Sequence, residues 1–80
     1  MRFITGEVED LSSVYRYWAT EAESNWRDGP NEEVYQWCKE QLGDRGELSG
    51  IWNWSFNQSR LGCYYFVRAQ DMTLFLLRWS

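Results

Sequence analysis

The chain has 80 residues, a formal net charge of −4, six Trp, five Tyr, four Phe and no histidine. A chain this short forms one domain, which we expect to span residues 1–80. Without histidine it lacks the most common metal ligand and the usual proton carrier near neutral pH, which counts against metal centres and acid–base enzymes.

The first predicted elements are a strand and a long helix. Residues 2–8 are rich in β-forming side chains and predict a short opening strand. Asp10 is a favourable N-cap for a helix over residues 11–26. Tyr17 falls off the apolar stripe of that helix, so we expect it to face solvent. The stripe has helical spacing and consists of Leu11, Val14, Tyr15, Trp18, Ala19, Ala22 and Trp26.

A second helix is predicted over residues 31–43. The stretch RDGP at 27–30 ends the first helix, and its proline is suited to the start of the next one. Glu32 and Glu33 are favourable near the positive end of the helix dipole, and Gly43 is suited to the C-terminal cap. The face expected to point inward holds Val34, Tyr35, Cys38 and Leu42, with Trp37 at its edge.

The C-terminal half predicts a hairpin and a closing element. Residues 51–57 alternate, with Trp52, Trp54 and Phe56 on one side, and residues 63–68 return as a second strand after the turn QSRLG. Residues 71–79 form either a short helix capped by Asp71 or a third strand. We favour the helix, because AQD is typical of a helix start.

These elements together predict an α+β fold. We expect a short N-terminal strand, then two amphipathic helices packed on an antiparallel hairpin, and a short closing helix or third strand.

The cysteines and the overall hydropathy predict a cytoplasmic protein. Cys38 and Cys63 belong to no C-x-x-C pair, and the sequence has neither a signal peptide nor an apolar stretch of membrane-spanning length. We therefore expect both thiols to be reduced and buried as small apolar groups.

No enzyme template fits the sequence. No histidine can activate a cysteine or serine nucleophile, and neighbouring carboxylates such as Glu32 and Glu33 point in different directions on a helix. No metal-ligand spacing or glycine-rich phosphate loop is present. We expect no catalytic residue, no metal and no cofactor.

Nucleic-acid binding remains an alternative. The strand at 63–68 could present Tyr64, Phe66 and Arg68 as a platform for stacking the bases of a single strand, with Arg60 beside it. The charge counts against this alternative, because residues 1–47 carry a net charge of −6 that repels phosphates.

Protein binding suits the composition best. The predicted helices carry many carboxylates interspersed with aromatic residues, and such a surface can occupy a basic groove on another protein. The candidate anchors are Tyr17, Trp26 and Trp37, and the candidate charged contacts are Asp28, Glu32 and Glu33. The surplus of aromatic surface also leaves a homodimer open.

Two segments resemble small uncharacterised proteins encoded by tailed bacteriophages. The segments are YQWCKEQLG at 35–43 and YYFVRAQDMTLFLLRWS at 64–80, and they cover about half of the chain. The resemblance implies a setting in which a small acidic protein binds and inhibits a host factor, such as a transcription component or a defence nuclease. No activity is assigned to that group, so no functional residue is transferred.

Overall fold

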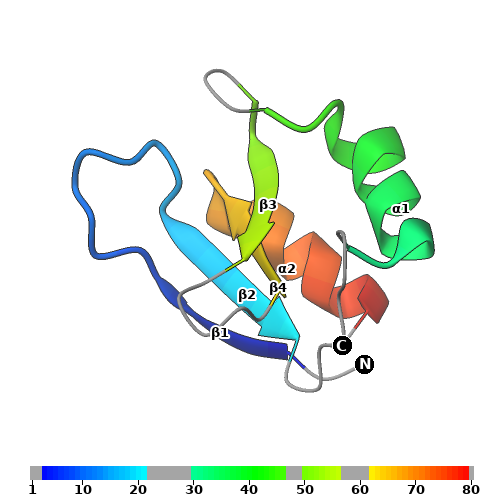
Figure 1. Cartoon of the computed structure of the whole chain (residues 1–80), viewed down its shortest axis with the longest axis horizontal. Helices are drawn as coiled ribbons and strands as arrows, with labels where there is room; N and C mark the ends of the chain where they lie inside the picture. The colour runs from blue at the N-terminus through cyan, green and yellow to red at the C-terminus, as the bar shows by residue number, and fades with distance from the viewer. Residues whose placement is uncertain (1–2, 22–29, 47–49, 57–61, 80) are drawn as a thin grey trace.

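The structure is a computed structural model that describes residues 3–21, 30–46, 50–56 and 62–79 (Figure 1). These residues form four strands and two helices. In chain order they are β1 (Phe3–Glu7), β2 (Tyr17–Glu21), α1 (Glu32–Leu42), β3 (Trp52–Phe56), β4 (Gly62–Phe66) and α2 (Ala69–Trp79). The α+β class is confirmed, but the arrangement differs from the predicted one, because the sheet contains a strand where a helix was expected.

The four strands form one antiparallel sheet in the order β1-β2-β4-β3. β1 pairs with β2 and β3 pairs with β4, and β2 joins the two pairs through β4, with Tyr17 opposite Phe66. The expected opening strand and C-terminal hairpin are therefore confirmed. Most of the turn expected between the hairpin strands lies outside the described residues.

The helix predicted over residues 11–26 is wrong. Residues 11–16 form a connection, residues 17–21 form β2, and residues 22–26 lie outside the described part of the chain. Asp10 does accept a hydrogen bond from a nearby backbone amide as a cap would, but the donor is Ser12 N–H, 2.9 Å away, in a turn. Asx turns and helix caps share this local chemistry, so the signal did not discriminate between them.

The residues of that predicted apolar stripe differ in burial in the structure. Leu11 is 88% exposed and Val14 is 51% exposed, whereas Ala19 is fully buried. Val, Tyr, Trp and Thr favour strands, and pairing on both sides of β2 outweighs the helical spacing. Tyr17 consequently packs partly buried against the core instead of facing solvent.

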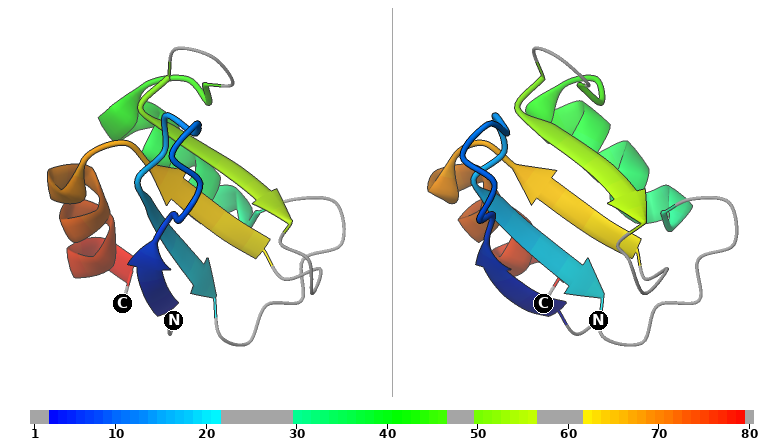
Figure 2. Two further views of the ribbon diagram at one scale, coloured as in Figure 1. Left: turned by 90° about the vertical axis from the view of Figure 1, so that its left-hand side faces the viewer. Right: turned by 60° about the vertical axis from the view of Figure 1, so that its left-hand side comes forward.

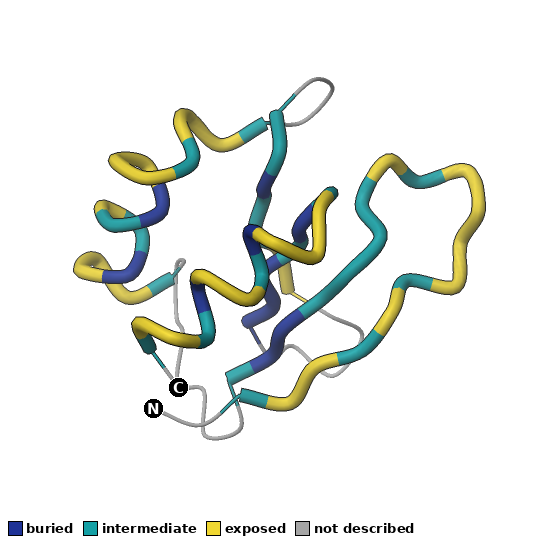
Figure 3. The backbone as a smooth tube through the Cα atoms, turned by 180° about the vertical axis from the view of Figure 1, so that it is seen from behind, coloured by how far each residue is buried: buried dark blue, intermediate teal, exposed yellow. Residues whose placement is uncertain are grey.

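Both helices cover one face of the sheet (Figure 2). Seen from the helix side, the inward positions of α1 and α2 are buried, and the connection between β1 and β2 projects outward with mostly exposed residues (Figure 3). The core lies between this face and the two helices. Its fully or nearly fully buried members are Ala19, Val34, Cys38, Trp52, Tyr64, Phe66 and Phe75.

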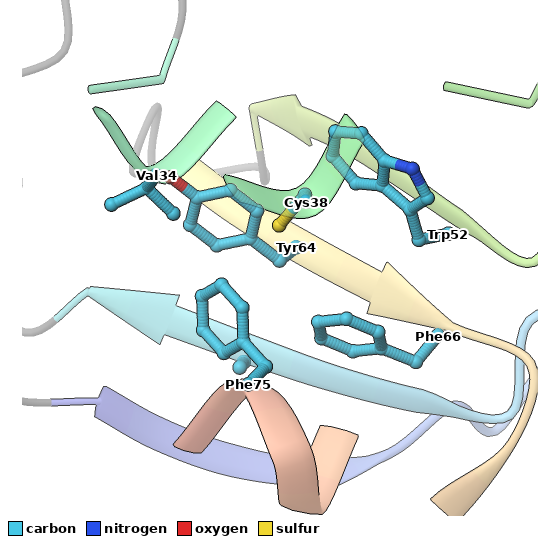
Figure 4. Packing of buried hydrophobic residues seen from close by; sticks show 7 residues of the cluster. Val34, Cys38, Trp52, Tyr64, Phe66 and Phe75 are labelled. Atoms are coloured by element: carbon cyan, nitrogen blue, oxygen red, sulfur yellow. The ribbon is translucent and has the colours of Figure 1, made fainter. Parts of the chain in front are cut away.

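Phe75 of α2 lies at the centre of the core (Figure 4). Its ring centroid is 4.9 Å from that of Tyr64, 5.2 Å from that of Phe66 and 5.0 Å from that of Phe3. Trp37 of α1 reaches the same ring edge-on, at 6.2 Å. One side chain thus joins both helices to strands from both halves of the sheet.

The ends of α1 follow from local sequence signals. The Asn31 side chain accepts a hydrogen bond from Glu33 N–H at 2.9 Å, so Asn31 is the N-cap and Pro30 precedes it. Gly43 ends the helix at a φ of 91°, a conformation that favours glycine, and its N–H donates to the Lys39 carbonyl. The predicted helix and its C-terminal cap are confirmed.

The closing segment is a helix, as favoured from the sequence. It begins at Ala69, two residues before the predicted cap. Asp71 lies in the first turn, 5% exposed, and accepts two hydrogen bonds from the Arg68 guanidinium at 2.7 and 3.1 Å. This bidentate pair satisfies a nearly buried carboxylate near the positive end of the helix dipole.

The edge of β3 that faces away from β4 is covered by Arg45 and Gly46, which precede this strand in the chain. Gly46 N–H donates to the Trp52 carbonyl at 3.1 Å, and the Arg45 side chain donates to the Trp54 carbonyl at 3.2 Å. The Arg45 guanidinium also lies 4.2 Å from the centre of the Trp54 ring. Contacts of this kind protect an edge strand from pairing with another chain.

We expect Phe75→Ala to lower the free energy of unfolding by about 3–5 kcal/mol, because it leaves a cavity among four aromatic rings. Leu77→Ala, on the same helix but at a position that is 79% exposed, should change it by less than about 0.5 kcal/mol. Urea unfolding at pH 7 measures both. If Phe75→Ala does not fold, Phe75→Leu replaces it, and equal losses at positions 75 and 77 would contradict the assignment of this core.

Candidate functional site

The face of the sheet opposite the helices is the candidate site. We call it the helix-free face, because neither α1 nor α2 covers it (Figure 2). Side chains alternate along a strand. Because Tyr64 and Phe66 point into the core, their neighbours in the strand and the residues paired with those neighbours point to this face. Its members from the four strands are Ile4, Gly6, Trp18, Thr20, Asn53, Ser55, Cys63 and Tyr65.

Trp18 lies across Gly6 on the neighbouring strand. The two residues are directly opposed in the β1–β2 register, and a Cβ atom built on Gly6 would lie 2.5 Å from Trp18 Cζ2. The indole N–H donates to the Glu7 carbonyl at 3.2 Å. The absence of a side chain at Gly6 therefore lets the indole lie against the β1 backbone, which fixes its orientation.

Tyr65 stands opposite Trp18 on β4 and packs beside another tyrosine. Its ring centroid is 6.1 Å from that of Tyr15, whose hydroxyl donates to the Gly46 carbonyl. Trp18 extends toward β1, whereas Tyr65 contacts Tyr15.

A pocket of about 510 Å³ opens on this face. Thr20 and Cys63, which are directly opposed on β2 and β4, line it and are only 5% and 3% exposed. Trp18 and Tyr65 contribute aromatic surface. The remaining lining comes from the end of β1 and the connection after it: Glu7, Val8, Glu9 and Asp10.

The lining of the pocket is acidic. The hydrogen bonds from Ser12 and, to a smaller extent, the charge of Arg16 lower the pKa of Asp10, so this carboxylate is ionised at neutral pH. Arg16 lies in an adjoining pocket of about 180 Å³ with Glu7, Val8 and Tyr17. Its guanidinium donates to the carbonyls of Tyr15 and Asp10.

Both thiols are buried, as expected, and they lie on opposite sides of the sheet. Cys38 belongs to the core, whereas Cys63 belongs to the helix-free face. Burial raises the pKa of Cys38 to about 12 and also raises the pKa of Cys63. A protonated thiol is a poor nucleophile, so Cys63 contributes surface to the pocket and no reactive sulfur near neutral pH.

The predicted protein-binding residues do not form one described surface. Glu32 and Glu33 are exposed at the start of α1. Trp37 packs edge-on against Phe75 and Trp79, at 6.2 and 6.3 Å, which gives its ring a packing role. Tyr17 is partly buried against the core on the helix side of β2. The other two residues of that set, Trp26 and Asp28, lie outside the described residues.

The predicted base-stacking residues are not accessible as a platform. Tyr64 and Phe66 have no exposed surface, because the helices cover the face to which they belong. Arg68 is exposed but forms the bidentate pair with Asp71. Arg60 lies outside the described residues. Strand alternation places Tyr64 and Phe66 on one face and Tyr65 on the other, and the position of the helices decides that Tyr64 and Phe66 are in the core.

The sequence analysis missed the residues that line the pocket. Trp18, Thr20, Glu7 and Glu9 were assigned to a helix or passed over, because residues 11–26 were interpreted with a helical period. A signal was present: YWATE at 17–21 contains three β-favouring residues, Tyr17, Trp18 and Thr20, within five positions.

The described residues contain neither a metal-holding cluster nor a membrane-spanning helix. Among residues 3–21, 30–46, 50–56 and 62–79, no group of three or more His, Cys, Asp or Glu side chains could hold a metal ion. Neither helix in this part of the chain has the length and apolar character needed to cross a membrane.

No protein-family model, no curated protein and no solved structure matches this chain.

Alkaline pH should destabilise the fold through the buried thiol of Cys38. The unfolded chain loses this proton near pH 9.0, whereas the native protein holds it to about pH 12. The native state therefore binds more protons in this interval, and the free energy of unfolding falls as pH rises above about 9. Between pH 8 and 10 we expect the free energy of unfolding of Cys38→Ala to fall by about 1 kcal/mol less than that of the wild type, as measured by urea unfolding. Equal losses would show that burial does not hold the Cys38 proton.

The contact between Trp18 and Gly6 can be tested by a double-mutant cycle. Gly6→Ala places a methyl group against the indole and should lower the free energy of unfolding by about 1–3 kcal/mol. In a Trp18→Leu background the same change should be neutral or stabilising, because alanine is favoured over glycine in a strand. Urea unfolding of the four proteins gives the coupling energy, and a coupling near zero would contradict the observed packing.

Proposed function

We propose that this chain is a non-enzymatic protein-binding module whose helix-free face binds a basic surface of another protein. The observation that carries the proposal is the pocket on this face, which Trp18 and Tyr65 line together with Glu9 and the ionised Asp10. Aromatic side chains that are partly exposed next to charged groups are typical of the contacts that contribute most to binding.

The charge of the chain supports a basic partner. The formal net charge is −4, and Glu9 and Asp10 bring two of the twelve acidic residues to one side of the pocket. Opposite charges accelerate association and discriminate against wrong partners. An acidic surface disfavours nucleic acid, so a protein is the better-supported partner class.

An inhibitory role toward a host factor rests on the resemblance to small phage-encoded proteins. In that setting, an acidic module prevents a host enzyme or defence complex from using its basic surface. The proposal assigns no catalytic residue and no cofactor to the chain, and it needs none, because occupying the surface is sufficient to inhibit.

Two acidic surfaces compete for the role of binding face. One is the pocket edge with Glu9 and Asp10, and the other is the start of α1 with Glu32 and Glu33. The pocket edge adjoins accessible aromatic surface. At α1, the described aromatic residue Trp37 is engaged with Phe75 and Trp79. We therefore favour the pocket edge.

The two surfaces are distinguished by matched charge reversals. Glu9→Lys should weaken capture of the partner at least about ten-fold, whereas Glu33→Lys should leave it within about twofold of wild type. Tagged protein is passed through a nuclease-treated bacterial lysate, and retained proteins are quantified by mass spectrometry. Each substitution changes the net charge by the same amount, so a difference reports position.

Stability and self-association are controlled on the same samples. Both positions are exposed, so thermal unfolding should change little, apart from about 0.3–1 kcal/mol for the lysine placed at the helix start. Light scattering tests for a homodimer. Loss of capture with Glu33→Lys and normal capture with Glu9→Lys would refute the proposed face.

A further inference from the structure

We infer that the pocket on the helix-free face receives an arginine side chain of the partner, a step that rests on the proposed function and names the ligand of the same site. The inference combines the shape of the pocket, its aromatic walls and its charge.

The pocket reaches down to the backbone of the sheet. Thr20 and Cys63 line it although they are only 5% and 3% exposed. Trp18 is held over Gly6 by a hydrogen bond and by close packing, and Tyr65 is supported by Tyr15. These walls are held in place by contacts within the protein, so binding a side chain between them requires little reordering.

The charge of the pocket selects a cation. Glu9 and Asp10 line it, and no described lysine or arginine does. Glu7 contributes backbone to the pocket, because its side chain alternates with Gly6 and points to the helix side, as Tyr17 does. Arg16 lies in the adjoining pocket, where its side chain donates to backbone carbonyls. Two carboxylates and one guanidinium leave a net charge of −1 around the site, which favours a positive ligand and opposes a phosphate or carboxylate.

The aromatic walls select a planar cation. A guanidinium can stack on the face of an indole or phenol ring while its N–H groups donate to a carboxylate, whereas an ammonium group interacts as a compact point charge. An arginine side chain is also long enough to place its apolar stem against Val8 and the rings while its charge reaches the acidic edge. The geometry thus points to arginine on a protein surface or peptide.

The test uses two peptides that differ only in charge. One is acetyl-Gly-Arg-Gly-Arg-Gly amide, and the other has citrulline in place of each arginine, which keeps the shape and removes the positive charge. Each is titrated into the full chain labelled with ¹⁵N. We expect the arginine peptide to shift the indole N–H of Trp18 and the amides of Thr20, Cys63 and Tyr65, and the citrulline peptide to bind at least about ten-fold more weakly.

Matched variants locate the binding. Glu9→Gln removes one charge at the pocket and should weaken the arginine peptide several-fold. Glu40→Gln removes one charge from the exposed face of α1, on the helix side of the sheet, and should change nothing. Both substitutions are at exposed positions, so a change in folding does not complicate the comparison. Raising the salt concentration should weaken the arginine peptide more than the citrulline peptide.

Several results would overturn the inference. They are equal affinity for both peptides, shifts confined to α1, no shift at millimolar peptide, or the same pocket shifts with a single-stranded oligonucleotide.

Failure here is separable from failure of the proposed function. If the peptides do not bind but capture of a host protein is still weakened by Glu9→Lys, the face is correct and the arginine pocket is wrong. If the arginine peptide binds in the pocket but this charge reversal leaves capture unchanged, the pocket is real and the proposed function is wrong.

Discussion

The antiparallel pairing of β2 with β4 is the constraint on which the rest of the structure depends. The register sets Ala19 opposite Tyr64 and Trp18 opposite Tyr65. Because neighbouring residues in a strand point to opposite faces, this single register places Ala19, Tyr64 and Phe66 under the helices and leaves Trp18, Thr20 and Tyr65 on the other side. A shift by one residue would exchange the core with the pocket.

The division of the aromatic residues follows from the size of the domain. A chain of this length has little interior, and each aromatic side chain covers about 150–250 Å² when buried. Four aromatic side chains are fully buried on the helix side: Trp52, Tyr64, Phe66 and Phe75. Trp18 and Tyr65 are only partly buried, against Gly6 and Tyr15. Partly covered aromatic surface held in place by close packing is suited to binding, which is why the helix-free face carries the proposed function.

The accuracy of the sequence predictions depended on how local the signals were. The helix after Asn31 and its end at Gly43 follow from side-chain capping and a positive φ, both of which lie within a few residues. The strand at 17–21 depends on pairing with residues 63–66, far along the chain. Its segment also has helical spacing and a capping aspartate, so local signals favoured the wrong element. The candidate site followed that error, because Trp18 and Thr20 reach the pocket only as alternate residues of a strand.

By itself the sequence determined the α+β class, the hairpin, the helix after Asn31, the burial of both cysteines and the acidic charge, and it favoured a helix over a strand for the closing segment. Each of these depends on composition or on contacts between near neighbours. Only the tertiary structure decided that residues 17–21 join the sheet, which side of the sheet the helices cover, and hence which aromatic rings are enclosed and which line a pocket. These outcomes depend on pairing between distant segments, and the free energy of that pairing exceeds the local preference of either segment alone.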